Sequence, residues 1–103
     1  MTDLQQELNS IKNQLIVNYQ PEKIILFGSM AKGQADEDSD IDLLVIKETT
    51  SSFGDRIREA VRGLKYKVPL DIIVYTPKEI EQLKNNNFFI HEIITEGVLL
   101  YEK

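Results

Sequence analysis

Three short apolar runs, each stopped by glycine or by polar residues, constrain the fold of this chain more than any other feature. They are Lys23–Phe27 (KIILF), Asp40–Ile46 (DIDLLVI) and Leu70–Tyr75 (LDIIVY). Runs of this length and composition are typical of strands buried inside a protein. Segments with helical patterns lie before, between and after them. The order of elements therefore predicts the α/β (α+β) class, with helices packed in layers against a sheet.

The segments around these strands carry helix signals. Apolar residues recur every three or four positions in the first segment and in the one before the third strand. Residues Thr76 to Glu79 (TPKE) combine a hydroxyl cap, a first-turn proline and a glutamate. Helices are expected over Asp3–Asn18, from Phe53 to Leu64, over Lys78–Lys84 and in a stretch ending at Glu96, with Gly97 as its cap. Met30–Ala35 is expected to form one or two helical turns, and Val98–Tyr101 (VLLY) a last edge strand.

Length and charge limit the class of protein. The chain has 103 residues, which fits a single domain over 1–103. Its net charge of −5 argues against a protein held on nucleic acid by phosphate contacts, because such a surface must be positive. No apolar stretch approaches the roughly 20 residues of a membrane span, and Met1 to Tyr19 lacks a signal-peptide core. We therefore expect a cytoplasmic protein that binds neither nucleic acid nor membranes directly.

Asp40 and Asp42 form a pair of carboxylates in the second run. Side chains two residues apart in a strand share one face, with Cα atoms roughly 6.5–7 Å apart, while Ile41 and Leu43 point the other way, into the core. Carboxylates this close are tolerated if they share a proton or if a cation lies between them. Hard oxygen ligands suit Mg²⁺ or Mn²⁺. Asp71, the one charge in the third run, is a third candidate, and three converging carboxylates can hold two metal ions.

Gly28 and Ser29 follow the first strand directly. A strand that ends in Gly-Ser and leads into a helical turn offers free backbone N–H groups and a hydroxyl, which suit a phosphate. Lys32, one turn further on, can add a positive charge. A phosphate site beside a metal site supplies the positioning and the charge neutralisation that phosphoryl or nucleotidyl transfer requires.

These residues together resemble a known signature. Gly28-Ser29, ten further residues and Asp40-Ile41-Asp42 read as the GS-x10-DxD motif of the nucleotidyltransferase superfamily related to DNA polymerase beta. The local sequence GSMAKGQADEDSDIDLLVI resembles that of the minimal nucleotidyltransferases of bacteria and archaea, and the ending IHEIITEGVLLY is similar too. Asp71 matches the third acid of the family. Lys32 stands where relatives often carry arginine, which binds phosphate in a bidentate manner that lysine cannot reproduce.

The resemblance implies a mixed sheet flanked by helices and the transfer of a nucleoside monophosphate, most often AMP from ATP. By resemblance, Asp40 and Asp42 ligate two Mg²⁺ ions, Asp71 holds one of them and helps to deprotonate the acceptor hydroxyl, and Gly28 and Ser29 hold the triphosphate. Minimal members are commonly paired with a small all-helical protein of the HEPN class encoded beside them. In several such pairs the nucleotidyltransferase is an antitoxin, which attaches AMP to a tyrosine of the toxin or neutralises it by binding.

Other functions fit the same residues. One is an antitoxin that neutralises its partner by binding alone, and another is a nucleotidyltransferase with a small-molecule acceptor such as an aminoglycoside. The sequence leaves open a homo- or hetero-oligomer and a partner contact at the basic run from Arg56 to Lys67 or at Phe88-Phe89. For the basic run a solvated helix face is the favoured interpretation. Asp36 to Asp38 are expected in a charged loop.

Overall fold

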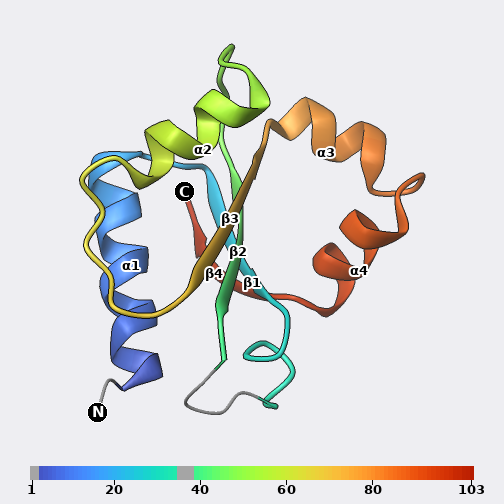
Figure 1. Ribbon diagram of the computed structural model, residues 1–103. Helices are drawn as coiled ribbons and strands as arrows, with labels where there is room; N and C mark the ends of the chain where they lie inside the picture. The colour runs from blue at the N-terminus through green and yellow to red at the C-terminus, as the bar shows by residue number, and fades with distance from the viewer. Residues whose placement is uncertain (1–2, 35–38) are drawn as a thin grey trace.

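The computed structural model describes residues 3–34 and 39–103, and these contain four helices and four strands (Figure 1). The elements in chain order are α1 (Leu4–Asn18), β1 (Lys23–Phe27), β2 (Ile41–Ile46), α2 (Phe53–Val61), β3 (Leu70–Tyr75), α3 (Pro77–Leu83), α4 (Phe88–Glu96) and β4 (Val98–Glu102). The strands and long helices expected from the sequence are present, although α2 ends at Val61 and β2 begins one residue after Asp40. Within these residues, no helix has the length and apolar character needed to span a bilayer.

The strands form one mixed sheet in the order β3-β2-β1-β4. β2 runs antiparallel to β1 and parallel to β3, and β4 pairs antiparallel with β1 at one edge. The predicted mixed sheet and the predicted edge strand are both confirmed. Because β1 runs antiparallel to β2, and β2 runs parallel to β3, the end of β1 meets the starts of β2 and β3 at one end of the sheet (Figure 1).

Helices cover both faces of the sheet, and alternate residues of each strand supply the two cores. On one face, α1 and α2 pack against Leu43 and Val45 of β2. On the other face, α3 and α4 pack against Leu44 and Ile46. Both faces of β2 are thus buried along most of its length, which explains its nearly continuous apolar sequence. Asp42 is the exception, and the same alternation places it on the face of α3 and α4.

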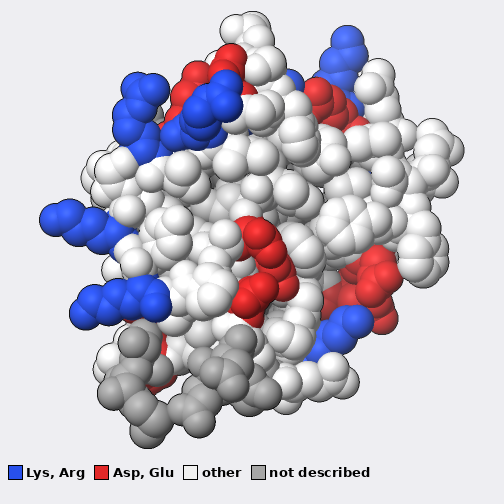
Figure 2. Space-filling model, in the orientation of Figure 1, with Lys and Arg blue, Asp and Glu red and all other residues white. Residues whose placement is uncertain are grey.

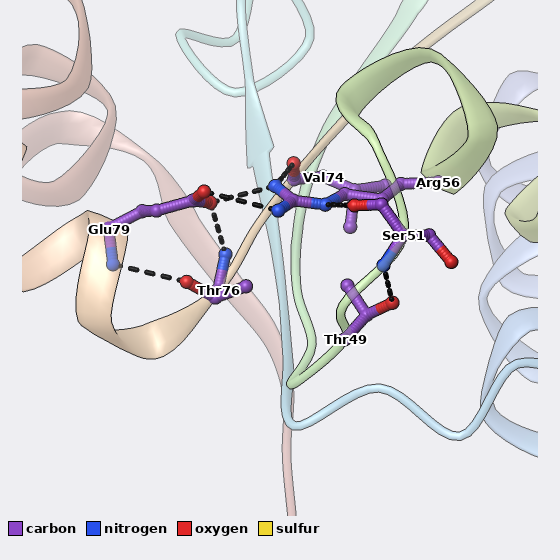
Figure 3. Close-up of polar contacts among 6 residues, drawn as sticks. All are labelled: Thr49, Ser51, Arg56, Val74, Thr76 and Glu79. Atoms are coloured by element: carbon purple, nitrogen blue, oxygen red, sulfur yellow. Dashed lines mark hydrogen bonds and ion pairs between the residues drawn. The ribbon is translucent and has the colours of Figure 1, made fainter.

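A partly buried ion pair joins α2 to α3 where β3 ends (Figure 3). The guanidinium group of Arg56 donates to both carboxylate oxygens of Glu79, at 2.7 and 3.1 Å. It also donates to the carbonyl oxygens of Ser51 and Val74. Glu79 in turn accepts from the backbone N–H of Thr76, which completes the predicted capping box. Arg56 is only 8% exposed, so the interpretation of the basic run as a solvated face is wrong at this residue.

The other basic residues of the run are exposed, as expected. Arg58 pairs with Asp55 within α2. Arg62, Lys65 and Lys67 are exposed in the segment that follows the helix, so the run does not form a single helix face.

Gly97 ends α4, as predicted, and allows the helix to lie close to the sheet. A Cβ atom at this position would lie 2.4 Å from the carbonyl oxygen of Ile93 and 2.6 Å from Cγ2 of Ile25 in β1. Its φ is −72°, so glycine is needed here for space and not for an unusual backbone conformation. The end of α4 is therefore held against β1.

Candidate active site

Three side chains lie in a row across the sheet, where β1 ends and β2 and β3 begin. Phe27 pairs with Asp42 across the antiparallel strands, and Asp42 pairs with Asp71 across the parallel strands. Phe27 packs against the core under α3 and α4, and strand alternation places both acids on the same face. Asp71 is exposed and Asp42 is half-buried. Figure 2 shows a group of acidic side chains open to solvent over the central strands.

The carboxyl group of Asp42 lies in the middle of this row. Burial raises its pKa above the ordinary aspartate value, and so do the charge of Asp71, hydrogen bonding to the Asp71 carboxyl, and the charge of Asp40, in decreasing order. All these causes oppose the charged form of Asp42. A cation placed between these carboxylates would reverse the effect, since it favours the charged form of each.

Gly28 lies directly against Asp42. Its φ is +80°, in the left-handed region that favours glycine. A Cβ atom on Gly28 would also lie 2.2 Å from Oδ2 of Asp42, much closer than any ordinary contact. This position therefore requires glycine for two independent reasons, and the absent side chain lets the backbone of the turn approach the carboxylate.

The turn after Gly28 is a single helical turn. The N–H of Lys32 donates to the carbonyl oxygens of Gly28 and Ser29, and the N–H of Gln34 donates to Ser29 at 2.9 Å. Gly33, with a φ of +71°, ends the turn. The expected turn is thus present as far as residue 34, and Ala35 lies outside the described residues. Among the described residues, the backbone N–H groups of Ser29 and Met30 donate to no backbone carbonyl oxygen.

Lys32 faces an acid on α4. Its Nζ atom lies 3.5 Å from Oε1 of Glu92, and its side chain is 49% exposed. An exposed pair at this distance is weak. The lysine can therefore exchange Glu92 for a phosphate bound at the turn at little cost in free energy.

The fit of these residues to a divalent cation depends on what else binds. Within residues 3–34 and 39–103, no three His, Asp or Glu side chains are arranged to hold a metal ion by themselves. Asp42 and Asp71, however, are adjacent oxygen ligands whose mutual repulsion a cation would relieve. Mg²⁺ usually takes one or two carboxylates and completes its shell with water and substrate phosphates. The site therefore fits Mg²⁺ that binds together with a phosphorylated ligand.

The sequence-predicted residues are brought together to different degrees. Gly28, Asp42 and Asp71 are contiguous, and Asp40 is exposed one residue before β2. The charged loop expected at Asp36 to Asp38 lies outside the described residues. Sequence reasoning missed Glu92, the partner of Lys32. The only sequence feature that could have drawn attention to Glu92 was its position one helical turn before Glu96 on a predicted helix.

Two solved structures share this fold. A chain in the crystal structure of "a putative nucleotidyltransferase from Sulfolobus solfataricus" superposes with a TM-score of 0.68 at 22% identity, covering 95% of this chain and 79% of that chain. A chain in the crystal structure of "the toxin-antitoxin with AMP-PNP" superposes with a TM-score of 0.60, also at 22% identity, covering 92% and 73%. The fold is thus that of a nucleotidyltransferase.

The sequence comparisons agree. A family model described as "Polymerase beta, Nucleotidyltransferase" matches residues 9–103, and the chain belongs to this family. Two proteins of Methanocaldococcus jannaschii, each named "Putative protein adenylyltransferase", are similar to it. One is 37% identical over 79 residues, covering 77% of each chain. The other is 29% identical over 77 residues, covering 75% of this chain and 76% of the relative.

Proposed function

We propose that this nucleotidyltransferase transfers AMP from ATP to a hydroxyl group of a partner protein. The observation that carries the proposal is the contact of Gly28 with Asp42 beside Asp71, because it sets a glycine turn suited to phosphates against two carboxylates suited to a metal ion. The names of the two archaeal relatives favour a protein acceptor and an adenylyl group. The expected cytoplasmic location stays a prediction.

In this proposal the predicted residues form a phosphate-binding group and a metal-binding group. Gly28 and Ser29 bind the triphosphate through backbone N–H groups and the serine hydroxyl, and Lys32 leaves Glu92 to neutralise phosphate charge. Asp40, Asp42 and Asp71 would hold two Mg²⁺ ions. When bound, the ions neutralise the charge that develops on the phosphates during transfer.

The transfer step then follows ordinary nucleotidyl chemistry. The acceptor oxygen attacks the α-phosphorus, a new oxygen–phosphorus bond forms, and the bond from the α-phosphorus to the bridging oxygen breaks. Pyrophosphate leaves with that oxygen. The proton of the acceptor hydroxyl passes to Asp71, the exposed carboxylate of the row, and from there to water.

The proposed acceptor is a tyrosine of a small all-helical HEPN-class toxin, with this protein as its antitoxin. The supporting observations are the signature of the minimal nucleotidyltransferases in the sequence and the toxin-antitoxin structure among those that share the fold. Asp42 and Asp71 lie side by side at the end of the sheet and are called the acid row here. A partner protein must in this case bring its hydroxyl to this acid row.

Intact-mass spectrometry of the partner tests this function. The HEPN-class protein encoded beside this one is incubated with it, Mg²⁺ and each nucleoside triphosphate in turn. A gain of one or more adenylate groups with ATP, abolished by Asp42→Asn, is the expected result. A stable complex without any mass gain would refute the transfer and favour neutralisation by binding. Absence of both complex and mass gain would redirect the search to small-molecule acceptors.

A further inference from the structure

A cavity of about 240 Å³ lies between the end of β1, the turn that follows it and α4. Phe27, Gly28 and Ala31 line one side, and Phe89 and Ile93 line the side of α4. Pockets for whole drug-sized ligands span about 300–1,000 Å³. This cavity is smaller, so its size suits one flat heterocycle better than a complete nucleotide.

Two residues that line the cavity are also neighbours of Asp42. Gly28 lines the cavity and touches Asp42, and Phe27 lines it and pairs with Asp42 across the sheet. A ligand with its phosphates at Gly28 and Ser29 can therefore extend directly into the cavity. We propose that the cavity binds the base of the nucleoside triphosphate and that Glu92 and Glu96 select adenine through its 6-amino group. The inference rests on the proposed function, since that function places the phosphates.

The apolar walls suit a base. The rings of Phe27 and Phe89 meet edge to face, with centroids 5.7 Å apart and an interplanar angle of 87°. Phe89 is nevertheless 51% exposed, so one part of its ring remains available for contact with a ligand. Aromatic side chains of this kind bind bases by stacking, which is tolerant of base identity. Phe89 therefore accounts for affinity for a base, and another feature must account for choice among bases.

In this proposal, two glutamates that line the cavity determine which base is bound. Glu92 and Glu96 both line the cavity, one helical turn apart on α4. Two carboxylates repel phosphate, so the phosphates are expected at the turn and the base at α4. A carboxylate accepts hydrogen bonds and donates none. It complements the 6-amino group of adenine and opposes the 6-oxo group of hypoxanthine, which is left without a donor.

The test measures equilibrium binding to the whole chain in Mg²⁺ by calorimetry, with ATP, ITP and inorganic tripolyphosphate as ligands. ATP and ITP differ at the 6-position of the base, and tripolyphosphate has no base. We expect ATP to bind about tenfold more tightly than either of the others. Equal affinity for ATP and tripolyphosphate would overturn the base site and leave the proposed function intact. Failure of all three ligands to bind would overturn the proposed function as well.

Matched variants locate the effect. Phe89→Ala should weaken ATP binding about tenfold and leave tripolyphosphate binding unchanged, which also shows that the variant is folded. Phe88→Ala, on the neighbouring residue that is 80% exposed and outside this cavity, should change neither affinity. Glu92→Gln or Glu96→Gln should bring ITP to within about twofold of ATP, because an amide can donate to the 6-oxo group. Unchanged discrimination in both glutamate variants would overturn the role of α4 in base choice.

Discussion

Asp42 has four neighbours that matter: Gly28 on one side, Asp71 on the other, Asp40 two residues upstream and Phe27 across the sheet. A bound cation would stabilise the charged form of this carboxylate, which burial and two like charges disfavour. A group in such a position costs stability unless it binds something. The residue is thus better explained by function than by folding.

Replacement of Asp42 by asparagine separates these two roles. Asp42→Asn removes repulsion between adjacent strands, so we expect the ligand-free protein to gain about 0.5–1 kcal/mol of unfolding free energy and a few degrees in melting temperature. Transfer should fall below detection because a metal ligand is lost. Urea unfolding and the transfer assay measure the two effects. Loss of the folded state in this variant would make Asp42 a structural residue.

Gly28 and Gly33 form a matched pair of positions. Both have positive φ, but an added Cβ clashes with Asp42 only at Gly28 and meets nothing within 4 Å at Gly33. Gly33→Ala should cost only the backbone term, about 1–2 kcal/mol. Gly28→Ala should cost about 1–3 kcal/mol more, because of the overlap. Chemical denaturation of both variants measures the difference.

A double variant tests the cause of this difference. In Gly28→Ala/Asp42→Ala the two closest atoms, Oδ2 and Cγ of Asp42, are gone, and the remaining Cβ lies at 3.5 Å. Relative to Asp42→Ala alone, the added cost should then fall to that of Gly33→Ala. A cost that stays as high as in Gly28→Ala would show that the contact with Asp42 is not its origin.

Strand alternation in the sequence predicted that Asp42 lies on the opposite face of the sheet from Ile41 and Leu43, and the structure confirms this. The contact between Gly28 and Asp42 could not be predicted in the same way. It depends on the register of β1 against β2, which pairing between separate segments decides. The motif spacing identified the residues of the site, but the structure was needed to show which atoms touch.

At the scale of elements, the pair of Arg56 and Glu79 fixes α2 to α3. The hydrogen bonds from Arg56 lower the pKa of Glu79, and its bond from Thr76 acts in the same direction, while burial opposes them. A lowered carboxyl pKa in the folded state means that the unfolded chain binds more protons in acid. The stabilisation is therefore present above the ordinary value near 4.5 and is lost as the pH falls through the lowered one.

Glu79→Gln should accordingly lower the free energy of unfolding by about 1–2 kcal/mol at pH 7. The deficit relative to the native chain should shrink as the pH falls through the lowered pKa of Glu79, because Glu79 then becomes protonated and neutral too. Urea titrations across this pH range measure it. The control is Glu81→Gln on the same helix, which removes an exposed pair with Lys84 and should change stability by less than about 0.5 kcal/mol. A deficit that is independent of pH would contradict this account.

Local sequence signals predicted where helices and strands begin and end, but they did not predict which distant residues contact one another. The capping box at Thr76 fixed the start of α3 because all its members lie within four residues. The basic run was misread at Arg56, since its partner Glu79 is 23 positions away. Similarly, Gly97 was expected as a cap, but its need for space against Ile25 comes from the packing of α4 on β1. Contacts between distant segments decide such cases.

For the whole molecule, Asp40 and Asp71 are exposed at the end of the sheet where β2 and β3 begin. The acid row lies at that end, on the same face as the cavity beside α4. The Arg56–Glu79 pair lies where β3 ends, away from Asp71 at its start. Stabilising contacts and the candidate site are therefore separated along the sheet. An acceptor can approach the acid row without disturbing either core.

The central claim is that the bond broken is the one between the α- and β-phosphates of ATP. It is tested most directly by incubating the protein, its HEPN-class partner and Mg²⁺ with ATP labelled at either the α- or the γ-phosphorus. We predict that the α-label becomes covalently attached to the partner, that the γ-label does not, and that Asp42→Asn attaches neither. Attachment of the γ-label would indicate phosphoryl transfer and contradict the account, as would a stable complex that carries no label at all.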